Sequence, residues 1–97
     1  MSIARHYVMN AREGQDAVLE TALRDLADIV RGVPGSQGVE LLRDLGNERR
    51  FILIEKWDSV EAHSAGGKQI PKEALAPLMA ALDGPPDGAY FDYLKTV

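Results

Sequence analysis

The sequence contains no cysteine, and this absence excludes several classes of site together. Disulfide scaffolds, thiolate metal sites, iron–sulfur clusters and cysteine nucleophiles all require the thiol group. Histidine is almost as scarce, since His6 and His63 are the only two. Two imidazoles are too few for a zinc site built from three histidines. We therefore predict that the protein has no resident metal.

Other familiar signals are also missing. There is no glycine-rich dinucleotide motif and no P-loop, which leaves nothing to indicate a nucleotide cofactor. The net charge is −4, and Arg49–Arg50 is the only basic cluster, so we expect no nucleic-acid partner. No apolar run is long enough to span a bilayer, and Met1–Asn10 lacks the apolar core of a signal peptide. We expect a single domain over residues 1–97, cytoplasmic and without a membrane partner.

Hydrophobic periodicity predicts one clear helix. Between Leu19 and Val30 the apolar residues recur at the spacing of a single helical face. Gly32 and Pro34 then end that helix. Short apolar and aromatic runs bounded by turn residues predict four strands. These are Ile3–Asn10, Gln37–Asp44, Arg49–Trp57 and Ala89–Lys95.

A second helical region follows the third strand. Asp58 or Ser59 provides a side chain that can cap its first turn. Gly66–Gly67 breaks or loosens the helix, and Pro71 suits the first turn of another one. Because Pro77 interrupts the second apolar stripe, we expect a kink there or a helix start just before it, at Ala76.

The order of these elements, β-α-β-β-α-β, predicts an α+β fold: a ferredoxin-like split βαβ sandwich with an antiparallel sheet. Its helices cover one face of the sheet. The third strand is nevertheless apolar at both parities over Phe51–Ile54, which is typical of a strand buried on both faces. A second copy of the same sheet is the simplest cover for the other face, so we expect a homodimer.

Two segments carry a resemblance to a known family. ERRFILIEKWDSVEAH, residues Glu48–His63, is similar to a Phe-x-x-x-Glu-x-Trp-x-Ser-x-Glu-Ala core, and VPGSQGVELLRD, residues Val33–Asp44, is similar to a second strand led by Pro-Gly. With Glu13–Gly14 before the first helix, the chain resembles the antibiotic biosynthesis monooxygenase family of dimeric α+β barrels. The similarity extends over nearly the whole chain.

The resemblance implies a cofactor-independent monooxygenase. Its substrates would be a hydroxylated aromatic, such as a hydroquinone or a polyketide phenol, and O₂. His63 stands about six residues after Trp57, where the polyketide-oxidising branch has a tyrosine. In this scheme His63 takes the hydroxyl proton, and Trp57 forms a cavity wall whose indole N–H is donated to a developing oxyanion. The alternative is that both residues only pack a helix on the sheet.

Two residues of the first strand are candidate substrate ligands. His6 and Tyr7 are neighbours, so their side chains point to opposite faces of the sheet. One of them faces the helices, where the resemblance places the cavity. The sequence does not show which.

Two further candidates for substrate binding are Glu55 and Tyr93. Glu55 shares the face of Trp57 on an apolar strand, so its carboxylate needs a partner. We expect Arg43 on the neighbouring strand, or a residue of the second subunit, to provide it. Tyr93 and Tyr90 point to opposite faces of the last strand.

Two other functions remain open. Some relatives of the family isomerise small sugar-like signalling molecules, which requires basic residues in the pocket. Arg43, Arg49, Arg50 and Lys68 are the candidates for that role. A non-catalytic small-molecule-binding or stress protein can use the same fold. An aromatic lining favours the oxygenase, and a lining with two or more Arg or Lys favours the isomerase.

Overall fold

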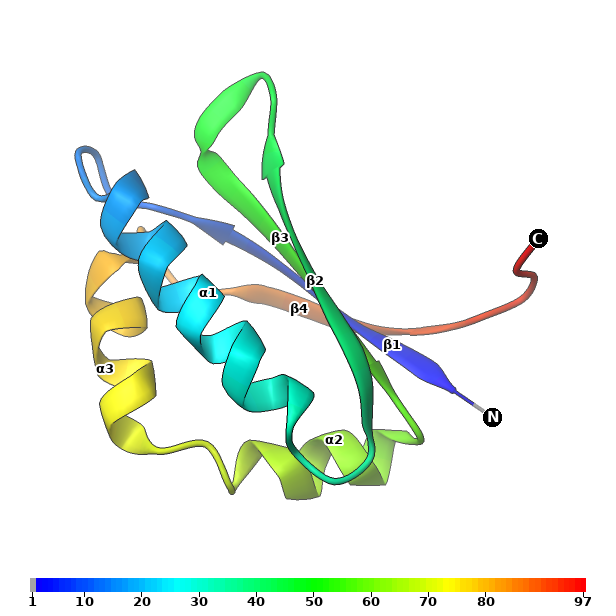
Figure 1. Ribbon diagram of the computed structural model, residues 1–97. Helices are drawn as coiled ribbons and strands as arrows, with labels where there is room; N and C mark the ends of the chain where they lie inside the picture. Colours follow the sequence, from blue (N-terminus) through cyan, green and yellow to red (C-terminus); the bar gives the residue numbers. More distant parts are fainter. Residues whose placement is uncertain (1) are drawn as a thin grey trace.

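The computed structural model describes residues 2–97 and confirms the predicted α+β order (Figure 1). The fold is the ferredoxin-like sandwich, with a four-stranded antiparallel sheet. The elements are β1 (Ile3–Asn10), α1 (Asp16–Arg31), β2 (Ser36–Asp44), β3 (Asn47–Trp57), α2 (Val60–Gly67), α3 (Lys72–Ala81) and β4 (Asp87–Asp92).

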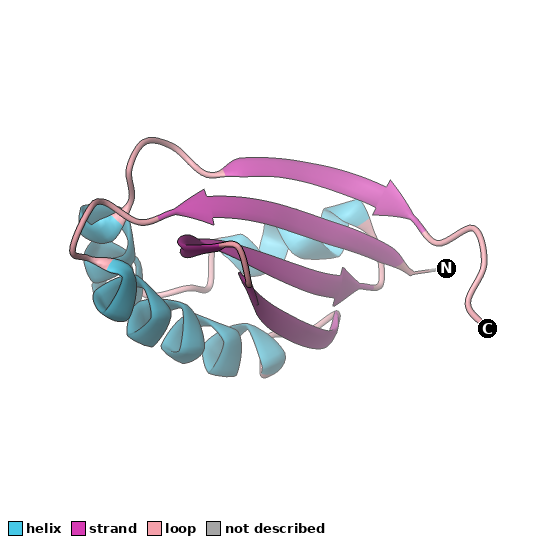
Figure 2. Ribbon diagram, turned by 90° about the horizontal axis from the view of Figure 1, so that it is seen from above, coloured by secondary structure: helices cyan, strands magenta, loops and turns pink. Residues whose placement is uncertain are grey.

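The sheet has the strand order β2-β3-β1-β4, so β3 and β1 are central. Figure 2 shows α1 and α3 on the same side of the four strands. In Figure 1, α2 runs across the end of the sheet where β3 finishes and β2 starts. The three helices therefore enclose the region in front of one sheet face. None of the helices in residues 2–97 has both the length and the apolar character needed to pass through a bilayer.

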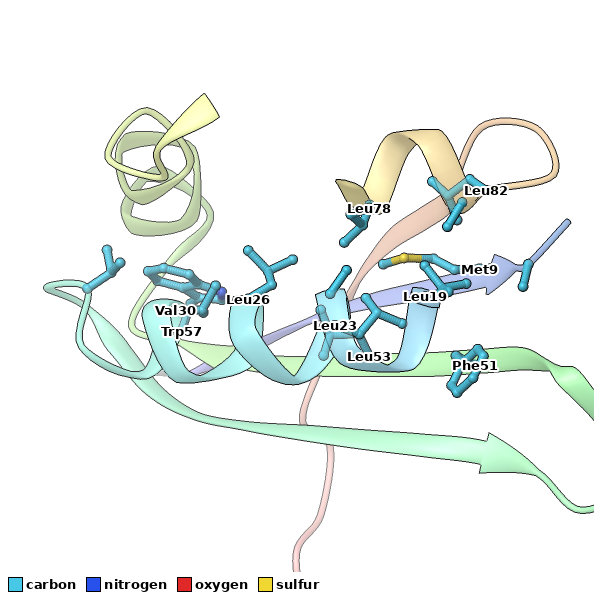
Figure 3. Packing of buried hydrophobic residues seen from close by; sticks show 14 residues of the cluster. Met9, Leu19, Leu23, Leu26, Val30, Phe51, Leu53, Trp57, Leu78 and Leu82 are labelled. Atoms are coloured by element: carbon cyan, nitrogen blue, oxygen red, sulfur yellow. The ribbon is translucent and has the colours of Figure 1, made fainter. Parts of the chain in front are cut away.

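The core forms between α1 and one face of β3 (Figure 3). Leu19, Leu23 and Val30 of α1 are 0% exposed, and Leu53 and Trp57 of β3 are 1% exposed. Burying each large apolar side chain contributes about 1.5–3 kcal/mol. The alternate β3 residues point to the opposite face, which carries no helix.

Helix α2 begins and ends where the sequence predicts. Ser59 is its cap, and its hydroxyl accepts a hydrogen bond of 3.0 Å from the backbone N–H of Ala62. The helix ends at Gly67. Helix α3 begins at Lys72, directly after Pro71, as the position of Pro71 predicts. Of the two alternatives at Pro77, a helix start at Ala76 is wrong, because the helix continues through Pro77.

The last strand lies earlier in the chain than predicted. We expected Ala89–Lys95, whereas β4 is Asp87–Asp92. The end of β4 is set by β1, the strand it pairs with. Asp92 pairs with Ile3, the first residue of β1, so the ladder ends there. The residues after Asp92 have no strand beside them, and the end of the chain extends away from the sheet (Figure 1). Tyr93–Lys95, which the sequence pattern assigned to the strand, therefore lie beyond the last residue pair of the β1–β4 ladder.

Candidate active site

A cavity of about 250 Å³ lies between the sheet and the helices. Its walls are mainly apolar and come from β1, β3 and all three helices. The polar or aromatic lining residues are Tyr7, Glu55, Trp57, His63 and Ser64. Ligand pockets of this kind combine an apolar wall with a few convergent polar groups.

Trp57 forms the end wall of the cavity and is held on two sides. Its indole N–H donates a hydrogen bond of 2.9 Å to Oε1 of Glu55, two residues earlier on the same face of β3. Glu55 is only 4% exposed, and this bond provides the partner that a buried carboxylate requires. Gly66 of α2 packs directly on the indole ring, so closely that no Cβ would fit there.

His63 lies one turn into α2 and lines the cavity beside Trp57, with the two ring centroids 5.5 Å apart. Its Nε2 is 3.0 Å from the hydroxyl of Tyr7 and 3.8 Å from Oε1 of Glu55. Its Nδ1 is 2.7 Å from the hydroxyl of Tyr90 on β4. Both ring nitrogens of this histidine are therefore engaged.

Arg5 supplies the positive charge next to this group. Its guanidinium carbon lies 4.8 Å from the ring centroid of Tyr7 and 4.3 Å from that of Tyr90. In the sheet, Arg5 is the direct cross-strand neighbour of Glu55 on one side and of Tyr90 on the other. These contacts place a cation immediately behind the tyrosine rings without making it part of the cavity lining.

Burial and this cation set the protonation of the site. Burial raises the pKa of Glu55, while the Trp57 hydrogen bond and the charge of Arg5 oppose the shift. Burial also lowers the pKa of His63, and Arg5 lowers it further. The pKa of Tyr7 is raised, chiefly by burial and against the influence of Arg5. The lowered pKa favours the neutral imidazole of His63, the form that can accept a proton.

Four of the six predicted site residues meet at the cavity: Tyr7, Glu55, Trp57 and His63. The other two lie elsewhere. His6 faces the opposite side of the sheet, where its ring meets the ring of Phe91 edge-on at 5.6 Å. Tyr93 follows β4 and its ring lies 5.1 Å from the ammonium group of Lys56, outside the cavity lining. Tyr90, not Tyr93, reaches His63.

Two expected interactions are corrected by the structure. Arg43 does not pair with Glu55, because the register of β2 places it opposite Phe51. Its guanidinium binds the carboxylate of Glu20 on α1 instead. We expected the indole N–H of Trp57 to be free to donate to an oxyanion of the substrate. It donates to the carboxylate of Glu55 instead.

Sequence reasoning missed Arg5 and the roles of two glycines. Arg5 and Tyr7 are two residues apart on β1, so their side chains point to the same face of the sheet. This alternation can be read from the sequence, but the sequence does not show which face lies toward the helices. Gly88 lies opposite Tyr7, where a Cβ would approach the Arg5 guanidinium to 2.6 Å. Gly66 was considered only as a helix breaker, although it is buried against the Trp57 ring.

The close contact of Gly66 with the Trp57 ring predicts that a larger residue at this position lowers the stability of the fold. A Cβ at this position would lie 2.7 Å from the Trp57 ring and 2.9 Å from Val33. We expect Gly66→Ala to lower the free energy of unfolding by about 1–3 kcal/mol, the usual cost of overpacking. Gly67→Ala is the matched control, because a Cβ there meets nothing within 4 Å. Urea denaturation of both variants measures the difference, and equal stabilities would contradict the packing described.

The cavity lining contains no arginine or lysine. Arg43 and Arg49 lie by other surface hollows. Lys68 follows the end of α2.

Within residues 2–97 no three His, Asp or Glu side chains come together in a way that would bind a metal ion. The arrangement can exchange a proton with a substrate through His63 and Tyr7, and it can hold an aromatic ring against apolar walls.

A family model matches about the first two-thirds of the chain. The model described as antibiotic biosynthesis monooxygenase matches residues 2–65, which include β1, α1, β2, β3 and most of α2. No curated protein matches the chain by sequence.

Solved structures share the fold across the full length of the chain. A candidate antibiotic biosynthesis monooxygenase from Bordetella bronchiseptica superposes with a TM-score of 0.85 at 19% identity, covering 97% of this chain and 98% of that one. SnoaB from Streptomyces nogalater, a cofactor-independent oxygenase, has a TM-score of 0.85 at 17% identity, covering 99% and 96%. Rv0793 from Mycobacterium tuberculosis has a TM-score of 0.84 at 16% identity, covering 99% and 98%.

Proposed function

Because this chain belongs to the antibiotic biosynthesis monooxygenase family, we propose that it oxidises a hydroxylated aromatic with O₂ and uses neither a metal nor a flavin. The observation that carries the proposal is the placement of His63. The imidazole of His63 lines an apolar cavity, with Nε2 directed at the Tyr7 hydroxyl at 3.0 Å. A base in this position suits the removal of a phenolic proton.

The substrate supplies the electrons in this reaction. Loss of the hydroxyl proton to His63, by way of the Tyr7 hydroxyl, gives a phenolate, which can transfer an electron to O₂. In the overall change a hydroquinone and O₂ become a hydroxyquinone and water: one oxygen atom enters the ring, and the other leaves as water with two of the substrate's hydrogens. The protein binds the ring, excludes water and accepts the first proton.

The cavity volume favours a small substrate. An apolar protein cavity of about 150 Å³ can hold a single benzene ring, and this one has about 250 Å³. A hydroquinone of one or two rings therefore fits better than a polyketide phenol of several rings. Leu53, Leu75 and Leu78 provide the apolar contacts for such a ring.

The lining also bears on the two other functions. An isomerase of a phosphorylated sugar-like molecule requires cations in the pocket, and the lining has none. A non-catalytic binder requires only the cavity. It does not require a histidine that is hydrogen-bonded at both nitrogens, and this feature favours the enzyme. A cytoplasmic location stays a prediction.

Oxygen uptake tests the proposal directly. The wild-type protein is incubated with one-ring and two-ring hydroquinones in an oxygen electrode, and products are analysed after reaction under ¹⁸O₂. We expect protein-dependent O₂ consumption and one labelled oxygen in the quinone product. Saturable substrate binding without O₂ consumption would support the binder instead. Consumption with peroxide as the only oxygen product would overturn the monooxygenase assignment.

We also propose that the outer face of the sheet forms a homodimer. Ile52 and Ile54 of β3 are only half-buried there, and Leu42 and Phe91 are 47% and 53% exposed. Contiguous apolar surface of this kind favours a protein interface, and a dimer typically buries about 800 Å² per partner. We expect sedimentation to give about twice the chain mass of 10.6 kDa, and Ile52→Asp to shift the protein to monomer. A stable wild-type monomer at micromolar concentration would contradict the dimer.

A further inference from the structure

The hydrogen bonds of His63 form a continuous path. Tyr7 and His63 line the cavity, whereas Tyr90 does not. The hydroxyl of Tyr7 contacts Nε2 at 3.0 Å, and Nδ1 contacts the hydroxyl of Tyr90 at 2.7 Å. Tyr90 is 40% exposed on the edge strand β4. The path therefore begins inside the cavity and ends at the protein surface.

We propose that Tyr7, His63 and Tyr90 form a proton relay that carries the substrate's hydroxyl proton from the cavity to solvent, with Tyr90 as its exit. The relay rests on the proposed oxygenase function. Without it, a proton accepted by His63 would stay in the site after each turnover. With it, the imidazole is returned to its neutral state before the next substrate binds.

The chemistry of the three groups permits this transfer. In the tautomer with the proton on Nδ1, the Tyr7 hydroxyl donates to Nε2 and Nδ1–H donates to the Tyr90 oxygen. As the Tyr7 oxygen takes the substrate proton, it passes its own proton to Nε2. Nδ1 then passes its proton to the Tyr90 oxygen, and the Tyr90 hydroxyl releases one to water. One proton enters and one leaves, and no electron moves. The imidazole is then neutral with its proton on Nε2, and exchange of that proton back to Nδ1 restores the starting tautomer before the next turnover.

The surroundings of the path support the same role. Arg5 lies 4.8 Å and 4.3 Å from the two tyrosine ring centroids, so its charge disfavours a lasting imidazolium at His63 and favours onward transfer of the proton. Gly88 leaves the space that the guanidinium occupies. Glu55, 3.8 Å from Nε2, is the only carboxylate among the lining residues. The α1 and α3 residues that line the cavity carry no charge.

The kinetic test uses Tyr90→Phe, which keeps the ring and removes the exit hydroxyl. We expect kcat on a confirmed hydroquinone to fall about tenfold with KM unchanged, less than for loss of the base itself, because water offers a slower exit. High concentrations of a small buffer should restore much of the lost kcat in Tyr90→Phe and change the wild type little. A structural role for the hydroxyl would not respond to buffer. Unchanged kcat, or a loss without buffer rescue, would overturn the relay.

Nitrogen NMR of the His63 ring tests the path without any substrate. We expect a neutral imidazole with its proton on Nδ1 in the wild type, and movement of that proton toward Nε2 in Tyr90→Phe. An imidazolium at neutral pH, or a proton on Nε2 in the wild type, would overturn the outward relay. If the wild type consumes no O₂ with any hydroquinone, the proposed function fails, whereas a normal wild type with an unaffected Tyr90→Phe means that only the relay fails.

Discussion

Trp57→Ala is expected to lower the free energy of unfolding by about 3–5 kcal/mol, the range for truncating a large aromatic residue in a core. Trp57 is 1% exposed and fills the space between the end of β3, Val33 and Gly66 of α2. Truncation also removes the donor to Glu55, which leaves a buried carboxylate without its hydrogen bond. Since small domains are stable by about 5–15 kcal/mol, the variant should be close to unfolding at 37 °C.

The measurement is urea denaturation followed by circular dichroism, because Trp57 is the only tryptophan and its loss removes the fluorescence signal. Protein concentration must be held constant, since dimer formation would contribute to stability. Trp57→Phe separates the two effects: it keeps most of the ring and removes the N–H, and we expect a smaller loss of about 1–3 kcal/mol. Leu94→Ala, at a side chain 93% exposed, should change little. A loss below about 1 kcal/mol for Trp57→Ala would contradict the packing role.

The sequence was sufficient to predict the first three strands, the first helix and a cap at Asp58 or Ser59, because each depends on local pattern, whereas the bounds of the last strand depend on its pairing with β1. Side-chain orientation was not predictable in the same way. In β1 both His6 and Tyr7 are plausible inward residues. In β3 all four residues of Phe51–Ile54 are apolar, so hydrophobicity does not show which of them face the helices. The orientation follows only from the pairing of Tyr7 with Leu53 and from the packing of Leu53 on α1.

The partner of Glu55 shows the same limit. Arg43 was a reasonable choice while β2 was known only as a neighbour of β3. The register, with irregularities near Ser36 and Asp44, places Val39 opposite Glu55 instead. The cation opposite Glu55 on the other side is Arg5, which lies fifty residues earlier in the sequence. Pairings of this range are determined by the whole sheet and not by any local motif.

The position of His63 was predictable for a different reason. Trp57 ends β3 and Ser59 caps α2 almost at once, so a residue one helical turn later has little freedom in where it points. Its two tyrosine partners come from β1 and β4, which are remote in sequence, and they could not be paired with it in advance. Its part in catalysis stays a prediction.

Replacing His63 with alanine should have the largest effect on activity. A general base contributes about 10²–10⁴-fold, so we expect kcat/KM of His63→Ala on a confirmed hydroquinone to fall at least ~10²-fold. His63→Gln tests whether hydrogen bonding alone is enough: it preserves polar contacts with the tyrosines but cannot take the proton, and it should lose as much. His6→Ala removes the other histidine, on the opposite face of the sheet, and should stay within about threefold of wild type.

The pH dependence of activity distinguishes a base from a packing residue, because a packing role for His63 would not produce an acid limb. His63 acts as a base only when neutral, so activity should fall as the pH drops through its pKa. Burial and the charge of Arg5 lower that pKa below the ordinary value of 6.5, and the acid limb of kcat/KM should therefore lie below pH 6.5. The limb should be absent from any residual activity of His63→Ala. If that variant keeps turnover within about threefold of wild type, or retains the same limb, His63 is a packing residue of α2 and the base must be sought elsewhere in the cavity.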